Sequence, residues 1–290
     1  MWVDVSGAID HVVAAVLEAK TASIENTQPY FDIVGQTGLR NRLLYNALGR
    51  VNVPTTILEI GPWKGASTAS LLYGNEANTS LYTVDNWSES GGSEENLLTT
   101  LPVDYSKLTL FSRNWANVNM FELTPYDIFV FDADDFRGCF EKYIEKLADI
   151  SIVVVDDWNW PSLQASVNEA FTNTGVGVVH SELVVTDFND KPEENFWNGV
   201  GVFVLVRGGV GAGAGADSVE IVNEPAPAAP EPVAEPAPAA PEPAPAAPEP
   251  TSEPAPSAPE PAAPDSTVDS GNGGEGGEGG EGGDAGVVLG

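Results

Sequence analysis

The sequence is poor in cysteine and in basic residues. Among its 290 residues Cys139 is the only cysteine, so a disulfide within the chain is excluded. Lys and Arg together number 12 against 43 Asp and Glu, which gives a formal net charge of -31. An excess of negative charge repels nucleic-acid backbones and anionic membrane surfaces, so we expect neither as a partner.

Long apolar runs are also lacking. No stretch of the sequence approaches the roughly 18 consecutive apolar residues that a membrane span requires. The start of the chain, MWVDVSGAID, has neither the basic region nor the long apolar core of a secretory signal. We therefore expect a soluble, cytoplasmic protein.

The composition changes abruptly after Arg207. A Gly- and Ala-rich stretch comes first, followed by recurring copies of EPAPAAP and a Gly- and Glu-rich end. Proline removes amide donors, and Ala and Glu offer too little apolar surface to offset the entropy of folding. We predict a folded domain over 1–208, a linker over 209–223 and a disordered tail over 224–290. The sequence identifies no partner for this tail.

Helix-like and strand-like segments follow one another through the first 208 residues. Amphipathic helical patterns begin after Ser6 and run between Thr37 and Gly49. Apolar strand-like runs then alternate with helical segments, at 56–60, 81–85, 108–112, 127–132 and 151–157. This alternation predicts an α/β fold with a doubly wound, mostly parallel sheet. Two final runs, 178–188 and 199–207, have no helix between them, so we expect a seven-stranded sheet with an antiparallel pair at one edge.

The stretch ILEIGPWKGASTASLL, residues 57–72, predicts a buried strand, a glycine turn and a helix. Gly61 and Gly65 mark positions where the backbone must turn tightly and approach a ligand. The exposed amides at the start of the helix suit a carboxylate or another anionic group. The stretch therefore predicts a cofactor cradle.

Acidic residues stand at the ends of the later strands, namely Asp85, Asp132, Asp156 and Asp157. Ligands of open parallel sheets bind in the crevice at the carboxyl ends of the strands. One acid in such a place could equally cap a helix or form a turn. Several strands that end in the same way favour a binding site.

With these motifs the chain resembles the class I S-adenosylmethionine-dependent methyltransferases, over roughly residues 36–208. The family pattern ExGxxxG is met by Glu59, Gly61 and Gly65, whereas the GxGxxG turn of NAD-binding proteins is absent. The resemblance implies that Asp85 binds the ribose hydroxyls and that Trp87 lies near the adenine, although a core or lid tryptophan is the alternative. The implied cofactor-binding set is Glu59, Gly61, Gly65, Asp85, Asn86, Trp87, Asn114 and Asp132.

Residues 131–159 look like the O-methyltransferase branch related to macrocin and catechol O-methyltransferases. In those relatives, acids that end the fourth strand and follow the fifth hold a divalent cation, and Asp132, Asp156 and Asp157 match these positions. Oxygen ligands suit Mg²⁺. Alternatively, Asp156 or Asp157 only caps a helix that begins near Pro161.

Macrocin-type sequences commonly have a histidine three residues after the fourth-strand acid, where this chain has Asp135. Aspartate is a poorer base near neutral pH unless its pKa is raised. Asp135 is therefore the candidate catalytic base, unless the metal alone acidifies the hydroxyl or the domain has lost its activity. We expect the two histidines, His11 and His180, to be structural.

The resemblance implies transfer of a methyl group from S-adenosylmethionine to a hydroxyl of a small molecule or sugar, with assistance from Mg²⁺. Phe136, Trp158 and Trp160 would line the acceptor pocket or belong to the core. Two alternatives stay open. The crevice could bind another nucleotide such as NAD or a nucleotide-sugar, or the domain could be a non-catalytic module on an acidic tether.

Overall fold

The computed structural model describes residues 2–25, 28–89, 91–101, 106–186 and 191–208. The predicted linker over 209–223 and tail over 224–290 lie outside the described residues. Within them the chain forms seven strands, which are β1 (Thr55–Ile60), β2 (Thr79–Asp85), β3 (Leu108–Ser112), β4 (Tyr126–Phe131), β5 (Leu147–Asp156), β6 (Gly177–Val184) and β7 (Val200–Val206).

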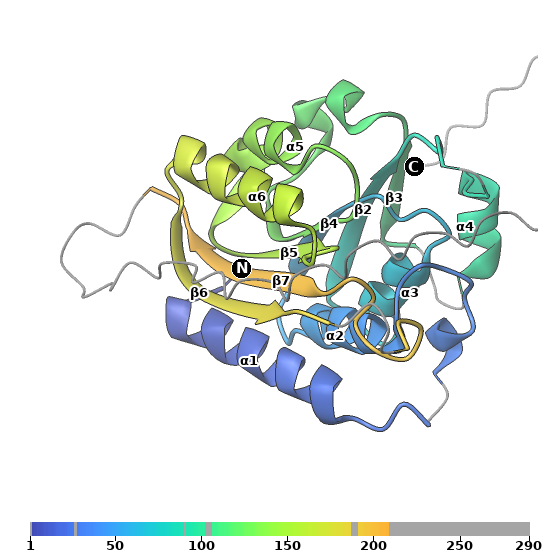
Figure 1. Cartoon of the computed structure of the whole chain (residues 1–290). Helices are drawn as coiled ribbons and strands as arrows, with labels where there is room; N and C mark the ends of the chain where they lie inside the picture. Colours follow the sequence, from blue (N-terminus) through green and yellow to red (C-terminus); the bar gives the residue numbers. More distant parts are fainter. Residues whose placement is uncertain (1, 26–27, 90, 102–105, 187–190, 209–290) are drawn as a thin grey trace, which may run out of the picture. The chain divides into compact units, whose positions relative to one another are not determined.

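These strands form one sheet in the order β3-β2-β1-β4-β5-β7-β6 (Figure 1). The first five strands pair in parallel, and β7 is antiparallel to both β5 and β6. In the sheet, β2 and then β3 lie on one side of β1, and β4 and then β5 lie on its other side. The direction in which strands are added along the chain therefore reverses at β1. The predictions of a seven-stranded, mostly parallel sheet and of an antiparallel pair at one edge are confirmed.

Helices cover both faces of the sheet (Figure 1). The α-helices are α1 (Val5–Thr21), α2 (Leu39–Gly49), α3 (Ala66–Leu72), α4 (Glu94–Thr100), α5 (Phe136–Tyr143) and α6 (Pro161–Thr174). Short 3₁₀ turns are η1 (Pro29–Phe31), η2 (Trp115–Asn117), η3 (Met120–Glu122) and η4 (Ile144–Lys146). On one face lie α1, α2 and α3, and on the other lie α5 and α6, which makes the sheet doubly wound.

The helix α1 begins one residue before Ser6, after which its pattern was expected to start. Asp4 is the N-cap, and its carboxylate accepts a hydrogen bond from the amide of Gly7 at 2.7 Å. A carboxylate at this position satisfies an amide that has no partner within the helix. The ring of His11 lies within hydrogen-bond distance of the Leu48 carbonyl, at 3.0 Å between Nε2 and O, so this histidine joins α1 to α2.

Two apolar clusters fill the space between the sheet and its helices. The cluster beneath α1 and α2 includes Val12 and Leu44, and the cluster beneath α5 and α6 is rich in phenylalanine. Phe136 and Phe140 stack there with ring centroids 5.3 Å apart, and Phe171 contacts both rings edge-on. Because β4 and β5 are buried on both faces, their sequences are apolar without alternation.

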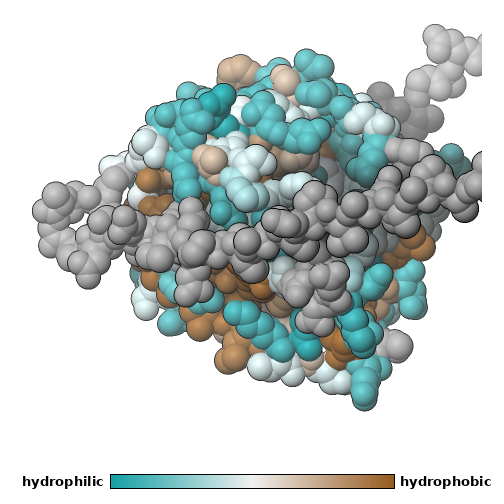
Figure 2. All heavy atoms as spheres, viewed as in Figure 1, coloured by the Kyte–Doolittle hydropathy of each residue, from teal (hydrophilic) through white to brown (hydrophobic). Residues whose placement is uncertain are grey.

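The outer surface is mostly polar over α5 and α6 in the view of Figure 2, with more hydrophobic residues over α1. Val13 and Leu17 are among the exposed apolar side chains of α1. Within the described part of the chain, no helix combines the length and the apolar character needed to cross a membrane.

Candidate functional site

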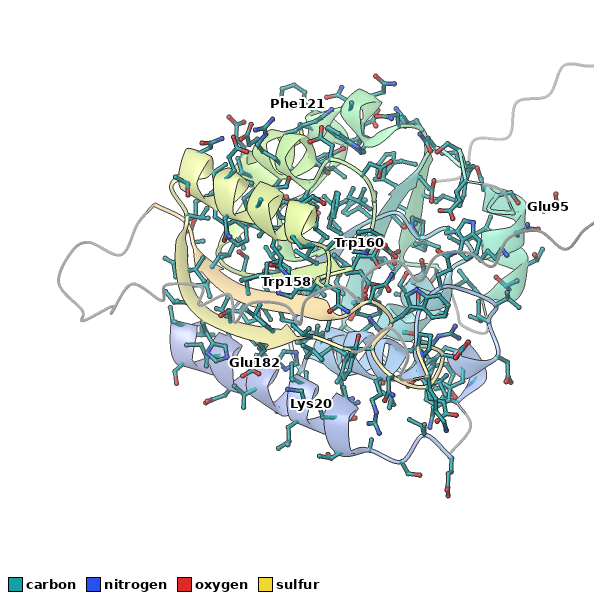
Figure 3. The ribbon with its side chains drawn as sticks, in the orientation of Figure 1. Lys20, Glu95, Phe121, Trp158, Trp160 and Glu182 are labelled. Atoms are coloured by element: carbon teal, nitrogen blue, oxygen red, sulfur yellow. The ribbon has the colours of Figure 1, made fainter. Side chains whose placement is uncertain are left out.

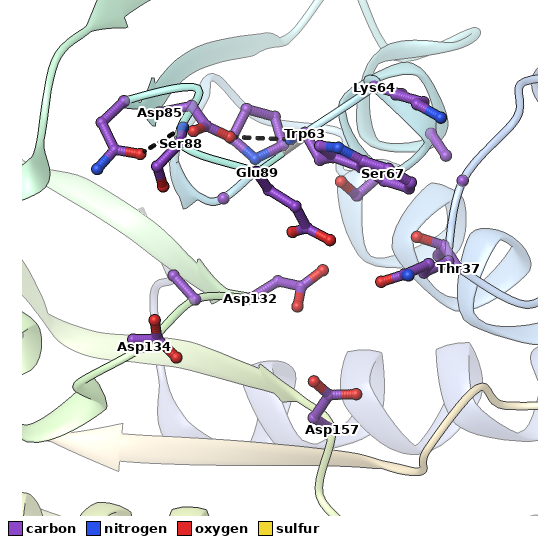
Figure 4. A pocket seen from close by; sticks show the side chains of 17 residues that line it. Thr37, Trp63, Lys64, Ser67, Asp85, Ser88, Glu89, Asp132, Asp134 and Asp157 are labelled. Atoms are coloured by element: carbon purple, nitrogen blue, oxygen red, sulfur yellow. Dashed lines mark hydrogen bonds between the residues drawn. The ribbon is translucent and has the colours of Figure 1, made fainter. Parts of the chain in front are cut away.

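A cavity of about 270 Å³ lies at the carboxyl ends of β1, β2, β4 and β5 (Figure 4). A smaller cavity of about 130 Å³ shares a wall with it and extends to Asn114 and Trp115, which follow β3. The shared wall consists of Gly61, Asp85, Asn86, Ser88, Ala133 and Asp134. The structure therefore brings together the ends of strands that the sequence analysis expected to form a crevice.

The turn after β1 requires glycine at Gly61. Its φ angle is +87°, and a Cβ atom there would lie only 1.8 Å from the carbonyl oxygen of Asp132. The amide of Gly61 donates to the carbonyl of Val84 at 3.0 Å, and the amide of Asp132 donates to that of Ile60 at 2.9 Å. The turn thus packs between the ends of β2 and β4 and borders both cavities.

Gly65, the second glycine of the motif, has another function. It is the N-cap of α3 with φ +89°, and a Cβ atom there would lie 3.2 Å from Leu97. Gly65 does not line either cavity. Its direct contact with a cofactor therefore stays a prediction, whereas its structural role at the start of α3 is clear.

Glu59 is fully buried in the middle of the sheet. Its Oε2 accepts hydrogen bonds from the hydroxyls of Thr68 at 2.7 Å and Thr83 at 2.8 Å, while its Oε1 has no partner among the described residues. Burial raises the pKa of this carboxyl, and the hydroxyls that bond to it, including that of Ser67, lower the pKa again. Glu59 joins β1 to α3 and β2 without lining either cavity, so its contact with a cofactor also stays a prediction.

Asp85 lies at the junction of the two cavities. Its Oδ1 accepts from the amide of Trp87 at 2.7 Å, and its Oδ2 accepts from the amide of Trp63 at 3.1 Å. Both tryptophans have positive φ angles, +55° for Trp87 and +44° for Trp63, in the left-handed region that most residues avoid. Asp85 thus stabilises two strained turns next to the place where the ribose was predicted.

Only some of the residues that were predicted to lie near the adenine line the cavities. Asn86 lines both cavities and Asn114 lines the smaller one, together with Trp115. Trp87 does not line either cavity and packs against the cluster that contains Tyr30 and Leu97. The alternative of a core tryptophan therefore fits Trp87 better than a contact with adenine.

Three carboxylates point into the larger cavity, those of Glu89, Asp132 and Asp157 (Figure 4). Burial, followed by the negative charges of Asp156 and Asp157, holds the pKa of Asp132 well above its usual range. Burial also raises the pKa of Asp157, against the hydrogen bond from Asn198, which lowers it. A cationic ligand in the cavity would favour the ionised forms of these carboxyls.

Asp156 is next to Asp157 but does not line the cavity. Its Oδ1 accepts from the Asn41 side chain at 3.1 Å and from the amide of Asp157 at 2.9 Å, and its Oδ2 accepts from the Tyr45 hydroxyl at 2.7 Å. Burial and the neighbouring charge of Asp157 raise the pKa of Asp156 to about 7. Asp156 is therefore a buried acceptor that joins β5 to α2.

These contacts do not fit the predicted metal site of Asp132, Asp156 and Asp157. The carboxylate of Asp156 does not line the cavity and accepts its hydrogen bonds from α2 and from the backbone. In the part of the chain that the structure describes, no group of three or more His, Cys, Asp or Glu side chains could hold a metal ion. The alternative of a helix cap does not fit either, because the N-cap of α6 is Trp160.

Asp135, the predicted base, is the N-cap of α5. It has a φ angle of +56°, and its carboxylate accepts from the amide of Gly138 at 3.0 Å. The side chain is exposed and does not line either cavity, whereas Asp134 lines both. The geometry gives Asp135 a structural role at the start of the helix, and a catalytic role stays an unsupported prediction.

The aromatic residues proposed for an acceptor pocket do not line either cavity. Phe136 and Trp158 are fully buried, and Trp158 packs edge-on against Phe203 at 5.2 Å between centroids. Trp160 is 50% exposed just before α6, beside Trp158 (Figure 3). The alternative of a core position is thus confirmed for Phe136 and Trp158.

Sequence reasoning missed several residues of the larger cavity. The loop before α2 contributes residues 35–37, and the loops after β1 and β2 contribute Lys64 and Glu89. The ammonium of Lys64 lies 4.1 Å from the centroid of the Trp63 ring. No motif marks the loop before α2, because its contribution depends on the packing of α2 against the sheet.

A known protein family matches part of the chain. Residues 58–158 match the protein family described as a methyltransferase domain. Among solved structures, the chain is similar to the O-methyltransferase TomG from Streptomyces achromogenes, with 19% identity, 67% of this chain and 90% of that chain covered, and a TM-score of 0.46. It is also similar to a precorrin-6y C5,15-methyltransferase from Geobacter metallireducens, with 13% identity, 61% and 91% covered, and a TM-score of 0.43.

A candidate RNA methyltransferase from Pyrococcus horikoshii is similar as well, with 11% identity, 68% of this chain and 97% of that chain covered, and a TM-score of 0.42. The expected lack of a nucleic-acid partner stays a prediction. No curated protein matches the chain. The residues that match a methyltransferase domain, 58–158, run from β1 to the end of β5 and contain the glycine turn between the two cavities.

Proposed function

We propose that this protein transfers a methyl group from S-adenosylmethionine to a hydroxyl group of a small molecule or sugar. The observation that carries the proposal is a cavity lined by the Gly61 turn and by Asp85. Asp157 lies across this cavity from Asp85, and Asp132 lies between them (Figure 4). The Gly61 turn suits a nucleoside, and the carboxylates of Asp132 and Asp157 suit a hydroxyl group. The family match of residues 58–158 supports the same class of reaction.

The cofactor would lie along the Gly61 turn, between the larger and the smaller cavity. Asn86 and Asn114 would face its base, and Asp85 would face its ribose. Each carboxylate oxygen has more than one acceptor site, so Asp85 can receive ribose hydroxyls while it binds two backbone amides. The cofactor supplies an electrophilic methyl group on a positively charged sulfur, so that an O–C bond forms as the C–S bond breaks and its electron pair stays on sulfur.

The other side of the cavity would take up the proton of the acceptor hydroxyl. Asp132 and Asp157 both point into the cavity, so a hydroxyl bonded to either carboxylate can pass its proton to that group. The negative charges of these acids also favour a positively charged methyl donor. Orientation of the reactants would make the largest contribution to the rate. It would lower the activation free energy by on the order of 7–11 kcal/mol in favourable cases.

Calorimetry with S-adenosylmethionine and, separately, with NAD tests which cofactor the cavity accepts. We expect binding of S-adenosylmethionine and none of NAD. Mass spectrometry should then detect methylated products when the loaded protein is offered a panel of phenols, catechols and glycosides. Binding of NAD alone would overturn the proposal, and cofactor binding without transfer to any acceptor would favour the non-catalytic alternative.

The same transfer assay tests the role of a metal. Because Asp156 does not line the cavity, we expect transfer to be unchanged by EDTA and by added Mg²⁺. A loss of transfer on chelation, restored by Mg²⁺, would show that metal assistance belongs to the reaction after all.

A further inference from the structure

A closed ring of hydrogen bonds lies behind Asp157. The Asn41 side chain donates from Nδ2 to Oδ1 of Asp156 at 3.1 Å, and the same Oδ1 accepts from the amide of Asp157 at 2.9 Å. Asn198 donates from its side chain to Oδ1 of Asp157 at 2.8 Å. The amide of Trp197 donates to Oδ1 of Asn41 at 2.7 Å, which closes the ring.

The ring joins three elements that are distant in the sequence. Asn41 belongs to α2, Asp156 and Asp157 end β5, and the segment 197–198 precedes β7. Asn41 and Asp156 are both buried, at 0% and 4% exposure, so water does not compete for their hydrogen bonds. Buried hydrogen bonds of this kind fix the relative positions of the groups that they join.

A second set of contacts holds α2 against the same segment. The amide of Leu39 donates to the carbonyl of Glu193 at 2.9 Å. At Gly38, a Cβ atom would lie 1.9 Å from the carbonyl oxygen of Asn195 and 2.5 Å from that of Pro192. The start of α2 therefore packs directly on the backbone of the segment that carries Asn198.

Asp157 is held in an uncommon conformation by these contacts. Its φ angle is +58°, in the left-handed region that few residues other than glycine adopt, although aspartate adopts it more often than most. Its carboxylate points into the larger cavity (Figure 4), and among the described residues Asn198 is the hydrogen-bond donor to it, at Oδ1. The orientation of this one carboxylate thus depends on residues that never reach the cavity.

We propose that this ring orients Asp157 toward the reacting methyl group and the acceptor hydroxyl, with Asn41, Asp156 and Asn198 as positioning residues. The proposal rests on the proposed methyl transfer, because it assigns the acceptor side of that same cavity. It gives Asp156 a role that a match to metal-binding relatives does not imply. It also gives α2, which lies outside the family match, a role at the site.

The test uses the ratio of two ligand affinities in the whole protein. Sinefungin carries a protonated amine where S-adenosylmethionine carries the sulfonium methyl, and S-adenosylhomocysteine has neither group. An aligned Asp157 carboxylate should favour the amine, so we expect the intact protein to bind sinefungin about tenfold more tightly than S-adenosylhomocysteine. Asn41→Ala and Asn198→Ala should each remove most of this preference and leave the affinity for S-adenosylhomocysteine within about twofold.

Asn46→Ala is the matched control. Asn46 is also an asparagine of α2, and its side chain donates to the carbonyls of Ser70 at 2.9 Å and Tyr73 at 2.7 Å, away from the ring. The control removes a comparable pair of hydrogen bonds and should keep the preference for sinefungin. If Asn198→Ala keeps the preference, or if Asn46→Ala loses it to the same extent as Asn41→Ala, the proposal is overturned.

Hydrogen exchange separates this proposal from the proposed function. The amides of Asp157 and Trp197 are donors within the ring, so both should exchange faster in Asn41→Ala and be unchanged in Asn46→Ala. If the intact protein binds neither ligand, the proposed function fails while the exchange data still decide whether the ring exists. If neither amide changes in Asn41→Ala, the ring is refuted even where methyl transfer is present.

Discussion

The two sides of the larger cavity are built from different kinds of contact. The glycine-turn side, consisting of Gly61, Asp85 and Asn86, comes from two adjacent strand ends within one short stretch of chain. The Asp157 side combines α2, the end of β5 and the segment before β7, and Asn41 and Asp156 are 115 residues apart. The first side depends on local backbone geometry, and the second depends on the packing of the whole domain.

This difference predicts how each side responds to substitution. A change on the glycine-turn side should act through steric overlap or a lost contact with the cofactor, and its effect should stay local. A change on the Asp157 side should act through unpaired buried groups, whose free-energy penalty does not depend on any ligand. Stability and cofactor affinity, measured on the same variants, therefore separate the two sides.

The largest effect is expected at Gly61. Gly61→Ala places a Cβ atom 1.8 Å from the carbonyl oxygen of Asp132, in a backbone conformation that alanine avoids. We expect the free energy of unfolding to fall by about 3 kcal/mol or more, with loss of cofactor binding. Gly74→Ala is the control, since Gly74 has φ +73° with nothing within 4 Å. Equal losses in the two variants, measured by urea unfolding, would show that the overlap at Gly61 is absent.

The next effect is expected at Asp156. Asp156→Ala leaves the buried donors of Asn41 and Tyr45 unpaired, so the free energy of unfolding should fall by about 2–3 kcal/mol. Asp157→Ala loses one hydrogen bond, from Asn198, at a partly exposed position, and it should lose about 1 kcal/mol. If chemical denaturation shows a larger loss of unfolding free energy for Asp157→Ala than for Asp156→Ala, the structural role of Asp156 is contradicted.

A smaller change in stability, but a clear change in affinity, is expected at Asp85. Asp85→Ala removes the acceptor predicted for the ribose, so cofactor affinity should weaken by about 1–3 kcal/mol. Asp134→Ala is a useful control, because Asp134 also lines both cavities but is exposed. Calorimetry that finds unchanged affinity in Asp85→Ala would remove Asp85 from the cofactor site.

The smallest effect is expected in the pH dependence of stability at Glu59. Because burial raises its pKa in the folded protein, Glu59 binds protons more strongly when folded than when unfolded. Its contribution to stability is therefore complete below the pKa of the unfolded chain and is lost as pH rises through the raised folded pKa. Glu59→Gln should flatten this part of the profile, measured by urea unfolding from pH 4 to 8, whereas an unchanged slope would show that Glu59 does not titrate in this range.

Much of the fold was predictable because its signals are local. The apolar runs that became β4 and β5 are continuous, as expected for strands buried on both faces, and an α-helix follows each of β1, β2, β4 and β5. The missing helix between β6 and β7 correctly indicated an antiparallel pair. The start of α1 was misplaced by two residues, because Asp4 rather than Ser6 precedes the helix and supplies the capping oxygen.

The acids of the site were harder to assign. Asp132, Asp135, Asp156 and Asp157 look alike in the sequence, yet two of them point into the cavity, one caps α5 and one is buried against α2. Each outcome depends on a partner elsewhere in the chain or on the backbone angle at that residue. No spacing within residues 131–157 carries that information.

The sequence by itself determined the order of strands and helices, the glycine turn and the acid that follows β2. Those features arise from hydrophobic periodicity and from backbone angles that few residues other than glycine adopt, and both act over a few residues. Only the tertiary structure decided that Asp157 points into the cavity while Asp156 binds Asn41 and Tyr45. The physical reason is that a buried carboxylate is stabilised wherever hydrogen-bond donors surround it, and here those donors come from a helix far away in the sequence.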